Sequence, residues 1–317
     1  MTDWLFVGPQ TLSGIGQVTA RYARLMGGEY VVAGDPPKKT HYDRGFIFVL
    51  PLQPFIDMCP HYAKLCDSMM YMTICETDTV HEDYGKLGAL SKTLYTPSEF
   101  CKNVFEKQFP ELTFKVVHLW ADPEPLPREP IFGLIHTDAF TFYTIGNVLD
   151  PRKNFRMLME AFVRCEFPPG SARILVKATC KAPINTPAPF VTVINEMLTN
   201  GQMEAVHEVG DCYVNCSHSE GVGMGAVEAA LRNKPVIITD YGGLKEYVRT
   251  PYTVRCTPCP VGMDDFLFRK EMTWGQPDLH ELMLFMKHAY EHRLAPYLAE
   301  KGFTAGLVSA VPSEFSQ

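Results

Sequence analysis

Residues 211–239 read DCYVNCSHSEGVGMGAVEAALRNKPVIIT, and this stretch decides the fold. The apolar run at residues 212–215 predicts a buried strand, and residues 225–232 have the composition of a helix. A second apolar run at residues 235–239 predicts the next strand. Because a strand, a glycine-containing loop, a helix and a strand follow one another, the stretch predicts a parallel α/β unit.

The same alternation extends in both directions along the 317 residues. In the first half we expect strands at residues 4–7, 30–33, 46–50, 70–74, 93–95 and 115–118, and helices at residues 16–26, 54–67, 83–90 and 99–109. In the second half we expect strands at residues 140–146, 173–177, 191–194, 212–215 and 235–239, and helices at residues 155–164, 203–209, 225–232, 244–248, 279–293 and 296–301. The pattern predicts an α/β protein with two doubly wound parallel sheets.

A proline-rich connector separates the two halves. Residues 121–130 read ADPEPLPREP, and this density of proline disfavours helix and favours an extended chain. We therefore expect an N-terminal doubly wound domain at residues 1–127 and a second one at residues 131–292. Residues 293–317 are expected to form a C-terminal helix or tail that packs back on the N-terminal domain.

The composition excludes several classes of protein. Hydrophobic residues make up 46% and charged residues 21% of the chain, which excludes a disordered or collagen-like protein. The net charge of 29 − 36 = −7 argues against binding to a nucleic-acid backbone, because such proteins need a basic patch. No apolar run reaches the length of about 18 residues that predicts a membrane span. The N-terminus MTDWLFVGPQ has the pattern of a strand rather than of a signal peptide.

The ten cysteines are scattered singly, apart from one pair, and predict a reduced, cytoplasmic protein. Cys256 and Cys259 form that pair, with the spacing CxxC. A zinc site needs a second pair of similar spacing, and a thioredoxin-like site needs a strand and helix at this point. Neither is present in the sequence, so we expect no zinc or redox chemistry at Cys256 and Cys259.

The first candidate site is the turn GPQTLSGIG at residues 8–16, between an expected strand and helix. Glycines such as Gly14 and Gly16 let backbone N–H groups approach an anion at the start of a helix. The spacing differs from the G-x-G-x-x-G fingerprint of dinucleotide-binding proteins. Both a phosphate contact and an ordinary strand-to-helix turn stay open at this point.

The second candidate is GNVLDPRKN at residues 146–154, where a strand ends at a glycine. Arg152 and Lys153 directly precede an expected helix, although the helix dipole disfavours cations at that end. A bound phosphate between these cations and the helix would remove the conflict. The alternative is a solvated loop in which the two charges have no partner in common.

The third candidate is SHSEGVGMGAVE at residues 217–228. Alternating glycines leave backbone bare where larger side chains would collide with a ligand. Glu220 and Glu228 bracket these glycines, and carboxylates accept hydrogen bonds from vicinal diols such as those of ribose or a hexose. A glutamate at the start of a helix can also simply match the helix dipole.

Together these motifs resemble the signature of retaining glycosyltransferases with the GT-B fold, specifically family four (glycosyl transferases group 1). Residues 220–239 carry a Glu-x7-Glu pair around a glycine loop and a following P-V-I-I strand. Residues 143–162, YTIGNVLDPRKNFRMLMEAF, resemble the opening of the family's donor domain. In the first half, the ETD at residues 76–78 and the YTPSEF at residues 95–100 resemble a pattern found in a subset of these enzymes.

The resemblance implies two Rossmann-like domains that face a cleft, the first on the acceptor side and the second binding the donor. It implies transfer of a hexose from a nucleotide-diphosphate sugar to an acceptor hydroxyl, with retention of the anomeric configuration. Lys153, with or without Arg152, would stabilise the leaving diphosphate, Glu220 would hold the donor sugar, and these three are the expected catalytic residues. The expected donor-binding residues are Gly14, Gly16, Asn147, His218, Gly221, Gly223, Met224, Gly225 and Glu228, the last holding the ribose.

On the acceptor side, Glu76 and His118 are weaker candidates for contact with the sugar or acceptor, because each follows an expected strand. For His118 a packing role is the alternative. No DxD-type motif is present, so neither a metal ion nor another cofactor is expected. The family usually has an arginine where this chain has Asn147, and its members are usually longer, so we expect some acceptor-side elements to be trimmed.

The partners implied are a UDP- or GDP-sugar and a carbohydrate, lipid-linked or other hydroxyl acceptor. Peripheral contact with a membrane stays open. Three alternatives remain beside the transferase: a catalytically inactive nucleotide-binding or scaffold protein of the same fold, a nucleotide-sugar epimerase, and a transferase that modifies bases of viral DNA. The acidic net charge of −7 disfavours the last.

Overall fold

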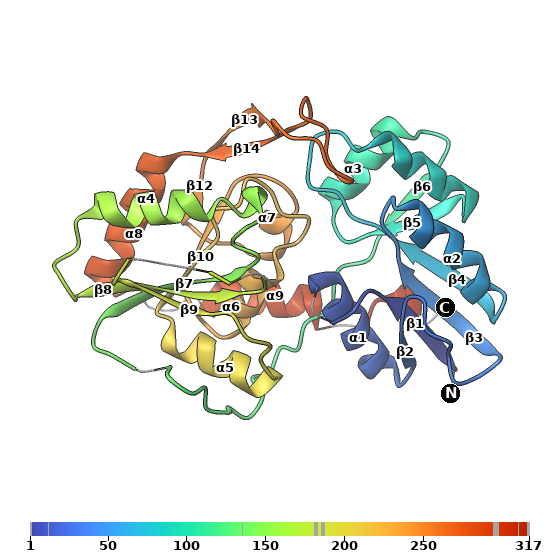
Figure 1. Ribbon diagram of the computed structural model, residues 1–317, viewed down its shortest axis with the longest axis horizontal. Coiled ribbons are helices and arrows are strands. Elements are labelled where there is room, and N and C mark those ends of the chain that lie inside the picture. Colours follow the sequence, from blue (N-terminus) through green and yellow to red (C-terminus); the bar gives the residue numbers. More distant parts are fainter. Residues whose placement is uncertain are drawn as a thin grey trace. The chain divides into compact units, whose positions relative to one another are not determined.

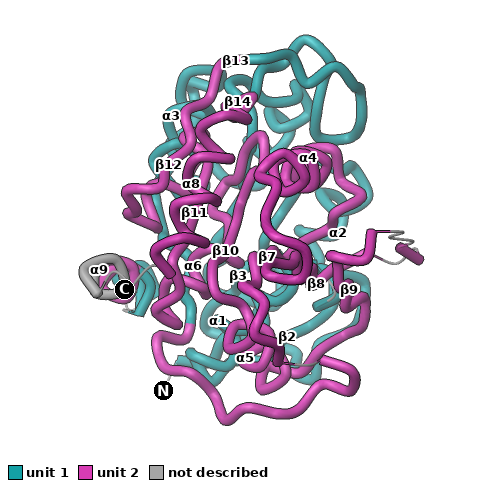
Figure 2. Tube along the Cα trace, turned by 90° about the vertical axis from the view of Figure 1, so that its left-hand side faces the viewer, with its two compact units in different colours: residues 1–121, 259–274, 308–317 teal, residues 122–258, 275–307 magenta. Residues whose placement is uncertain are grey.

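The computed structural model of the chain contains two compact units (Figure 2). Unit 1 comprises residues 1–121, 259–274 and 308–317, and unit 2 comprises residues 122–258 and 275–307. The structure describes residues 2–11, 13–134, 136–180, 183–184, 188–293, 298–309 and 311–315. No helix among these residues is long and apolar enough to cross a membrane.

Unit 1 is built on a parallel six-stranded sheet with the order β2-β1-β3-β4-β5-β6 (Figure 1). The strands are β1 (Trp4–Gly8), β2 (Glu29–Val32), β3 (Tyr42–Phe48), β4 (Cys66–Met72), β5 (Thr93–Thr96) and β6 (Thr113–Val116). The connections contain α1 (Gly14–Met26), α2 (Gln53–Ala63), the 3₁₀ helix η1 (Glu82–Ala89) and α3 (Glu99–Gln108).

Unit 2 has a second parallel six-stranded sheet, with the order β12-β11-β10-β7-β8-β9 (Figure 1). Its strands are β7 (Phe140–Gly146), β8 (Ala172–Ala178), β9 (Val191–Ile194), β10 (Cys212–Val214), β11 (Val236–Thr239) and β12 (Thr253–Val254). Its helical segments are η2 (Pro151–Lys153), α4 (Phe155–Cys165), α5 (Asn200–Val209), α6 (Met224–Leu231), α7 (Leu244–Tyr247) and α8 (Leu279–His292), and α9 (Leu298–Val308) ends where the chain returns to unit 1. The predicted class, two doubly wound parallel sheets, is confirmed.

The sheet order of unit 2 fixes where a ligand belongs. From β7 the chain first adds β8 and β9 on one side, then continues with β10, β11 and β12 on the other. In such sheets ligands bind at the carboxyl ends of the strands, where the order reverses. In unit 2 this point lies between β7 and β10.

Both faces of the unit 2 sheet are buried, which explains why its strands read as continuous apolar runs. On one face, Phe142 and Val176 belong to a core cluster that includes Leu158 of α4 and Met286 of α8. On the other face, the Tyr143 ring lies 5.6 Å from the ring of His207 in α5. The site is therefore built on a scaffold that is packed from both sides.

Two regions differ from the sequence-based expectation. The helix expected at residues 54–67 ends at Ala63, and β4 begins at Cys66 rather than at residue 70. The first residues of β4 are polar or exposed, so only its second half has the apolar pattern of a strand. The strands β13 (Cys256–Pro260) and β14 (Thr273–Pro277) were not expected, because the prolines and the glycine in CTPCP and TWGQP argue against strands.

The end of the chain completes the core of unit 1. Phe315 is 3% exposed, and its ring lies 4.9 Å from that of Tyr22 and 5.2 Å from that of Trp4. Phe6 and Phe46 complete the cluster, at 6.1 Å and 5.7 Å from Phe315. Residues 294–297, 310 and 316–317 of the expected C-terminal tail lie outside the described residues.

We expect Phe315→Ala to destabilise unit 1 by about 3 kcal/mol or more, because a buried aromatic ring is lost from a packed core. Urea unfolding followed by tryptophan fluorescence measures the change, since Trp4 lies in the same cluster. Val311→Ala is the matched control, because this side chain near the same end is 41% exposed. Equal stability of the two variants would contradict the assigned role of the C-terminal segment.

Candidate functional site

Polar loops leave the carboxyl ends of β7 and β10, the two strands at the reversal point of the unit 2 sheet. After β7, the short helix η2 presents Arg152 and Lys153. Asp150 caps η2 by accepting a hydrogen bond from the backbone N–H of Arg152, 2.9 Å away. Asn154 has a φ of 49°, a left-handed conformation that ends η2 and lets α4 begin in a new direction. The chain direction is thus fixed on both sides of the two cations.

The carboxylate of Glu220, on the loop after β10, is the centre of the site. Its Oε2 accepts from Arg152 Nη1 at 3.0 Å, and its Oε1 accepts from Lys153 Nζ at 2.6 Å. Ser217 Oγ and Asn215 Nδ2 also donate to Oε1, at 2.8 Å and 3.3 Å. The structure therefore brings together the three residues predicted to be catalytic.

Glu220 is only 5% exposed, yet it stays ionised. Burial alone raises the pKa of its carboxyl, but the charges of Lys153 and Arg152 outweigh that effect and hold the pKa well below its usual range. A buried carboxylate without these partners would take up a proton instead. The negative charge at this point depends on both cations.

Arg152 and Lys153 differ in exposure and in the number of hydrogen bonds that they make within the site. Arg152 is 8% exposed, and its guanidinium also donates to the carbonyl of Ser219 at 2.7 Å and lies 3.4 Å from Asp150 Oδ2. The side chain of Lys153 is 22% exposed, and among the described residues its ammonium donates to Glu220 alone. Since an ammonium carries three N–H donors, Lys153 retains donors for an anion. Arg152 serves the internal structure of the site.

The glycine loop is explained by backbone conformation and packing. Gly223 has a φ of +77°, and a Cβ there would lie 2.7 Å from Leu244 Cδ1. A Cβ on Gly225 would lie 2.4 Å from the hydroxyl of Tyr213. Gly221 is buried, and no described side chain caps α6, which begins at Met224. Packing within unit 2 therefore requires Gly223 and Gly225, and the backbone N–H groups at the start of α6 have no cap from a described side chain.

His218 connects the loop after β10 to two other segments of unit 2. Its backbone N–H donates to the carbonyl of Arg152 at 2.8 Å, and its ring Nδ1 lies 2.8 Å from the carbonyl of Gly275, which requires a proton on Nδ1. Burial lowers the pKa of His218. The contacts described for this histidine hold the loops together.

Glu228 and Asn147 are two further predicted residues of unit 2. Glu228, on α6, places Oε2 3.9 Å from Nε2 of His207, whose Nδ1 lies 2.9 Å from the hydroxyl of Tyr143. Asn147 is exposed and its Oδ1 accepts from Cys180 Sγ at 2.7 Å. Sequence reasoning missed His207, whose partner is distant in the chain. It also missed Asn215 and Ser217, although their place at the end of a strand was a usable signal.

The remaining predicted residues belong to unit 1. Gly14 is the first residue of α1, and Ser13 caps this helix by accepting from Gly16 N at 3.0 Å. A Cβ on Gly16 would lie 2.3 Å from the carbonyl oxygen of Gln10, so the turn itself requires this glycine. Glu76 and His118 are half-buried and follow β4 and β6.

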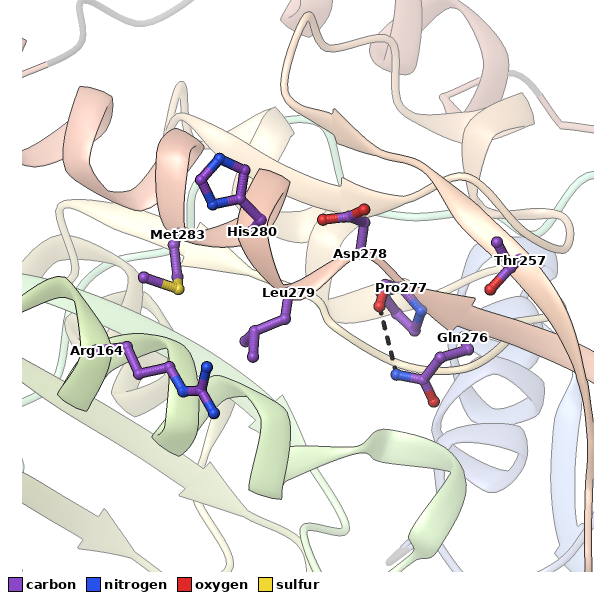
Figure 3. A pocket seen from close by; sticks show the side chains of 8 residues that line it. All are labelled: Arg164, Thr257, Gln276, Pro277, Asp278, Leu279, His280 and Met283. Carbon is purple, nitrogen blue, oxygen red and sulfur yellow. Dashed lines mark hydrogen bonds between the residues drawn. The ribbon is translucent and has the colours of Figure 1, made fainter.

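A separate open pocket of about 530 Å³ lies elsewhere in unit 2, beside α4 and the start of α8 (Figure 3). Arg164 and His280 are among the residues that line it. None of the predicted site residues lines this pocket, so it is not the site around Glu220.

Comparison with known proteins links this geometry to a family. Residues 191–260, which contain Glu220, the glycine loop and Glu228, match the family model described as glycosyl transferases group 1. No curated protein sequence matches the chain.

Solved structures show the same fold at low sequence identity. Sucrose-phosphate synthase from Thermosynechococcus elongatus has a TM-score of 0.64 and 10% identity, over 97% of this chain and 95% of that one. A UDP-forming α,α-trehalose-phosphate synthase from Burkholderia xenovorans has a TM-score of 0.61 and 11% identity, over 84% of this chain and 70% of that one. The pneumococcal O-GlcNAc transferase GtfA, solved with UDP and GlcNAc, has a TM-score of 0.54 and 11% identity over 84% of this chain. The match covers 54% of GtfA, so the chain spans about half of its length.

These findings confirm the resemblance to group 1 glycosyltransferases and the GT-B fold class. The structural neighbours support the fold, while the family match falls on the part of unit 2 that carries the Glu220 site.

We expect Glu220→Gln to lower the free energy of unfolding by about 3 kcal/mol, because it leaves two cations, one of them buried, without their carboxylate. The loss should shrink as the pH falls below about 4, since a carboxyl with a depressed folded pKa stabilises only above its unfolded pKa. Urea unfolding at a series of pH values measures both effects.

Asp240→Asn is the matched control, because Asp240 pairs with Lys245 at 2.8 Å on the surface of the same unit. Removing an exposed pair should cost less than about 1 kcal/mol. Equal losses for the two variants would mean that Glu220 does not neutralise a buried charge.

Proposed function

We propose that the protein transfers a hexose from a nucleotide-diphosphate sugar to an acceptor hydroxyl, with retention of the anomeric configuration. The observation that carries this proposal is the contact of Glu220 with Arg152 and Lys153 at the reversal point of the unit 2 sheet. The family match covers residues 191–260, which include Glu220 but not Arg152 or Lys153. The site combines a positive charge, bare backbone at a helix start and a carboxylate, which suit a diphosphate attached to a sugar.

Lys153 is the group that stabilises the leaving diphosphate. Departure of a nucleoside diphosphate builds negative charge on its outer phosphate, and a preorganised cation in a partly buried site offsets that charge. As Lys153 turns toward the phosphate, its 2.6 Å contact with Glu220 weakens. Glu220 Oε1 is then available to accept hydrogen bonds from the sugar.

The start of α6 and Glu228 hold the rest of the donor. Backbone N–H groups at Met224 and Gly225 contact the diphosphate, and the helix dipole favours its charge there. Glu228 accepts hydrogen bonds from the ribose hydroxyls, since its side chain is 14% exposed and lies one helical turn further along α6. Glu76 and His118 of unit 1 contact the acceptor, which is a carbohydrate, a lipid-linked sugar or another hydroxyl compound.

A catalytically inactive nucleotide-binding protein of the same fold is the second candidate. It is favoured by Asn147, which is exposed and bonded to its own loop and to Cys180. Such a protein would bind nucleoside diphosphates but would release no nucleoside diphosphate from any nucleotide sugar.

A panel of UDP, GDP and ADP, each free and as its common hexose conjugates, tests the proposal. Binding raises the unfolding temperature in proportion to RT ln(1 + [L]/Kd), so thermal shifts identify the nucleotide. Release of nucleoside diphosphate from the preferred conjugate, followed with and without simple sugars as acceptors, then separates the transferase from the inactive protein. Absence of a shift with every nucleotide would refute both.

We expect Lys153→Met to lower kcat by about 10²–10³-fold with a smaller change in KM, because its charge matters most as the bond breaks. Steady-state kinetics with the preferred donor measure this, and an unchanged kcat would place the diphosphate elsewhere. Arg152→Met is the comparison: its loss should appear mainly as lower stability, because this guanidinium is 8% exposed and bonded within the site.

We expect turnover to survive chelation by EDTA, because protein cations and backbone N–H groups neutralise the diphosphate in the proposed mechanism. Initial rates after EDTA treatment and dialysis provide the measurement. Loss of activity that Mg²⁺ or Mn²⁺ restores would show that the electrostatic assignment is wrong.

A further inference from the structure

Lys177 is a buried cation that the proposed mechanism leaves unused. It lies on β8 and is 5% exposed. Among the described residues, its ammonium makes a single hydrogen bond, at 2.6 Å to the carbonyl of the next residue, Ala178. Since an ammonium has three donors, two remain for a ligand.

A buried ammonium of this kind costs stability unless an anion compensates it. Burial lowers the pKa of Lys177, while Cys180 and Glu196 act in the opposite direction. Glu196 is exposed, so its charge is screened by water. The part of the chain that the structure describes thus supplies little compensation for Lys177, and an anionic ligand would supply more.

The position of Lys177 is that of a ligand-binding residue. In the ladder between β7 and β8, Lys177 pairs with Ile145 and Ala178 pairs with Gly146, the last residue of β7. The ammonium bonds to the carbonyl of Ala178, the last residue of β8, so it lies at the carboxyl edge of the sheet. This is the edge at which doubly wound sheets bind ligands.

Lys177 also shares a face of the sheet with the start of α6. Residues paired in register point to the same face, so Lys177 and Ile145 point to one side. A Cβ on Gly225 would lie 3.3 Å from Ile145 Cβ, which places the first turn of α6 over β7 on that side. Lys177 is therefore one strand away from the bare backbone of α6.

We propose that Lys177 binds the phosphate on the nucleoside side of the donor diphosphate, opposite Lys153. This inference rests on the proposed function. Glu220, assigned to the sugar, follows β10, whereas Lys177 lies on β8, and β7 runs between these two strands. A diphosphate over β7 with its sugar toward β10 turns its nucleoside side toward β8. The two lysines then neutralise the two phosphates from opposite sides.

The experiment compares Lys177→Met with wild type and with Lys153→Met, using calorimetric titration of UDP and UMP, or GDP and GMP if wild type prefers guanosine. We expect Lys177→Met to lower the affinity for the nucleoside diphosphate and for the monophosphate by the same factor. This factor should be about tenfold or more, as for a lost charged hydrogen bond. Lys153→Met should lower the affinity for the nucleoside diphosphate much more than the affinity for the monophosphate. Without nucleotide, Lys177→Met should unfold at the same or a higher temperature, because an uncompensated buried charge has been removed.

Lys234→Met is the matched control. Lys234 is also partly buried and donates to one backbone carbonyl, that of Glu208 at 3.2 Å, but it precedes β11 at the amino edge of the same sheet. Its loss should leave nucleotide affinity unchanged. The assignment of Lys177 is overturned if Lys177→Met binds both nucleotides like wild type, or if it only lowers the unfolding temperature. If wild type itself binds no nucleoside diphosphate, the proposed function has failed rather than this inference alone.

Discussion

The ion-paired carboxylate of Glu220 is the constraint on which the rest of the site depends. Its contacts with Arg152 and Lys153 tie the loop after β10 to the loop after β7, so the starts of α4 and α6 are positioned together. Because Glu220 and Arg152 are buried, removing any one partner leaves charge without compensation, and the three groups hold one another in place. Lys153 is the most exposed of the three, and in the proposed mechanism it exchanges Glu220 for a phosphate while Arg152 keeps its contact with Glu220.

The sequence contained enough to predict the scaffold and the composition of this site. Strands that are buried on both faces appear in the sequence as short apolar runs. Their alternation with helices predicts a parallel sheet, and the loops that follow the strands lie together at its carboxyl edge. Arg152, Lys153 and Glu220 each follow such a strand, but their common role was an expectation of the family resemblance, and their contact is a finding of the structure. The spacing of Glu220 and Glu228 linked them to a family that the match over residues 191–260 supports.

The sequence alone could not provide the distances in the site or the different roles of its two cations. Two adjacent cations look equivalent in a sequence, but the structure buries Arg152 against the Ser219 carbonyl and leaves Lys153 partly exposed. The assignment of residues 259–274 to unit 1 has no local signal in the sequence, since it depends on long-range contacts such as that of Arg269 with Glu82. Lys177 has no motif around it and is recognised only through its burial and its place in the β7–β8 ladder.

Amide hydrogen exchange with and without saturating UDP, GDP or ADP tests the central claim most directly, because it locates the nucleotide without any substitution. The account predicts that the nucleotide that binds will slow exchange most in residues 146–154 and 217–228, the two loops joined by Glu220 and the start of α6. Binding accompanied by unchanged exchange in both segments would contradict it, because the nucleotide would then lie away from the reversal point of the unit 2 sheet.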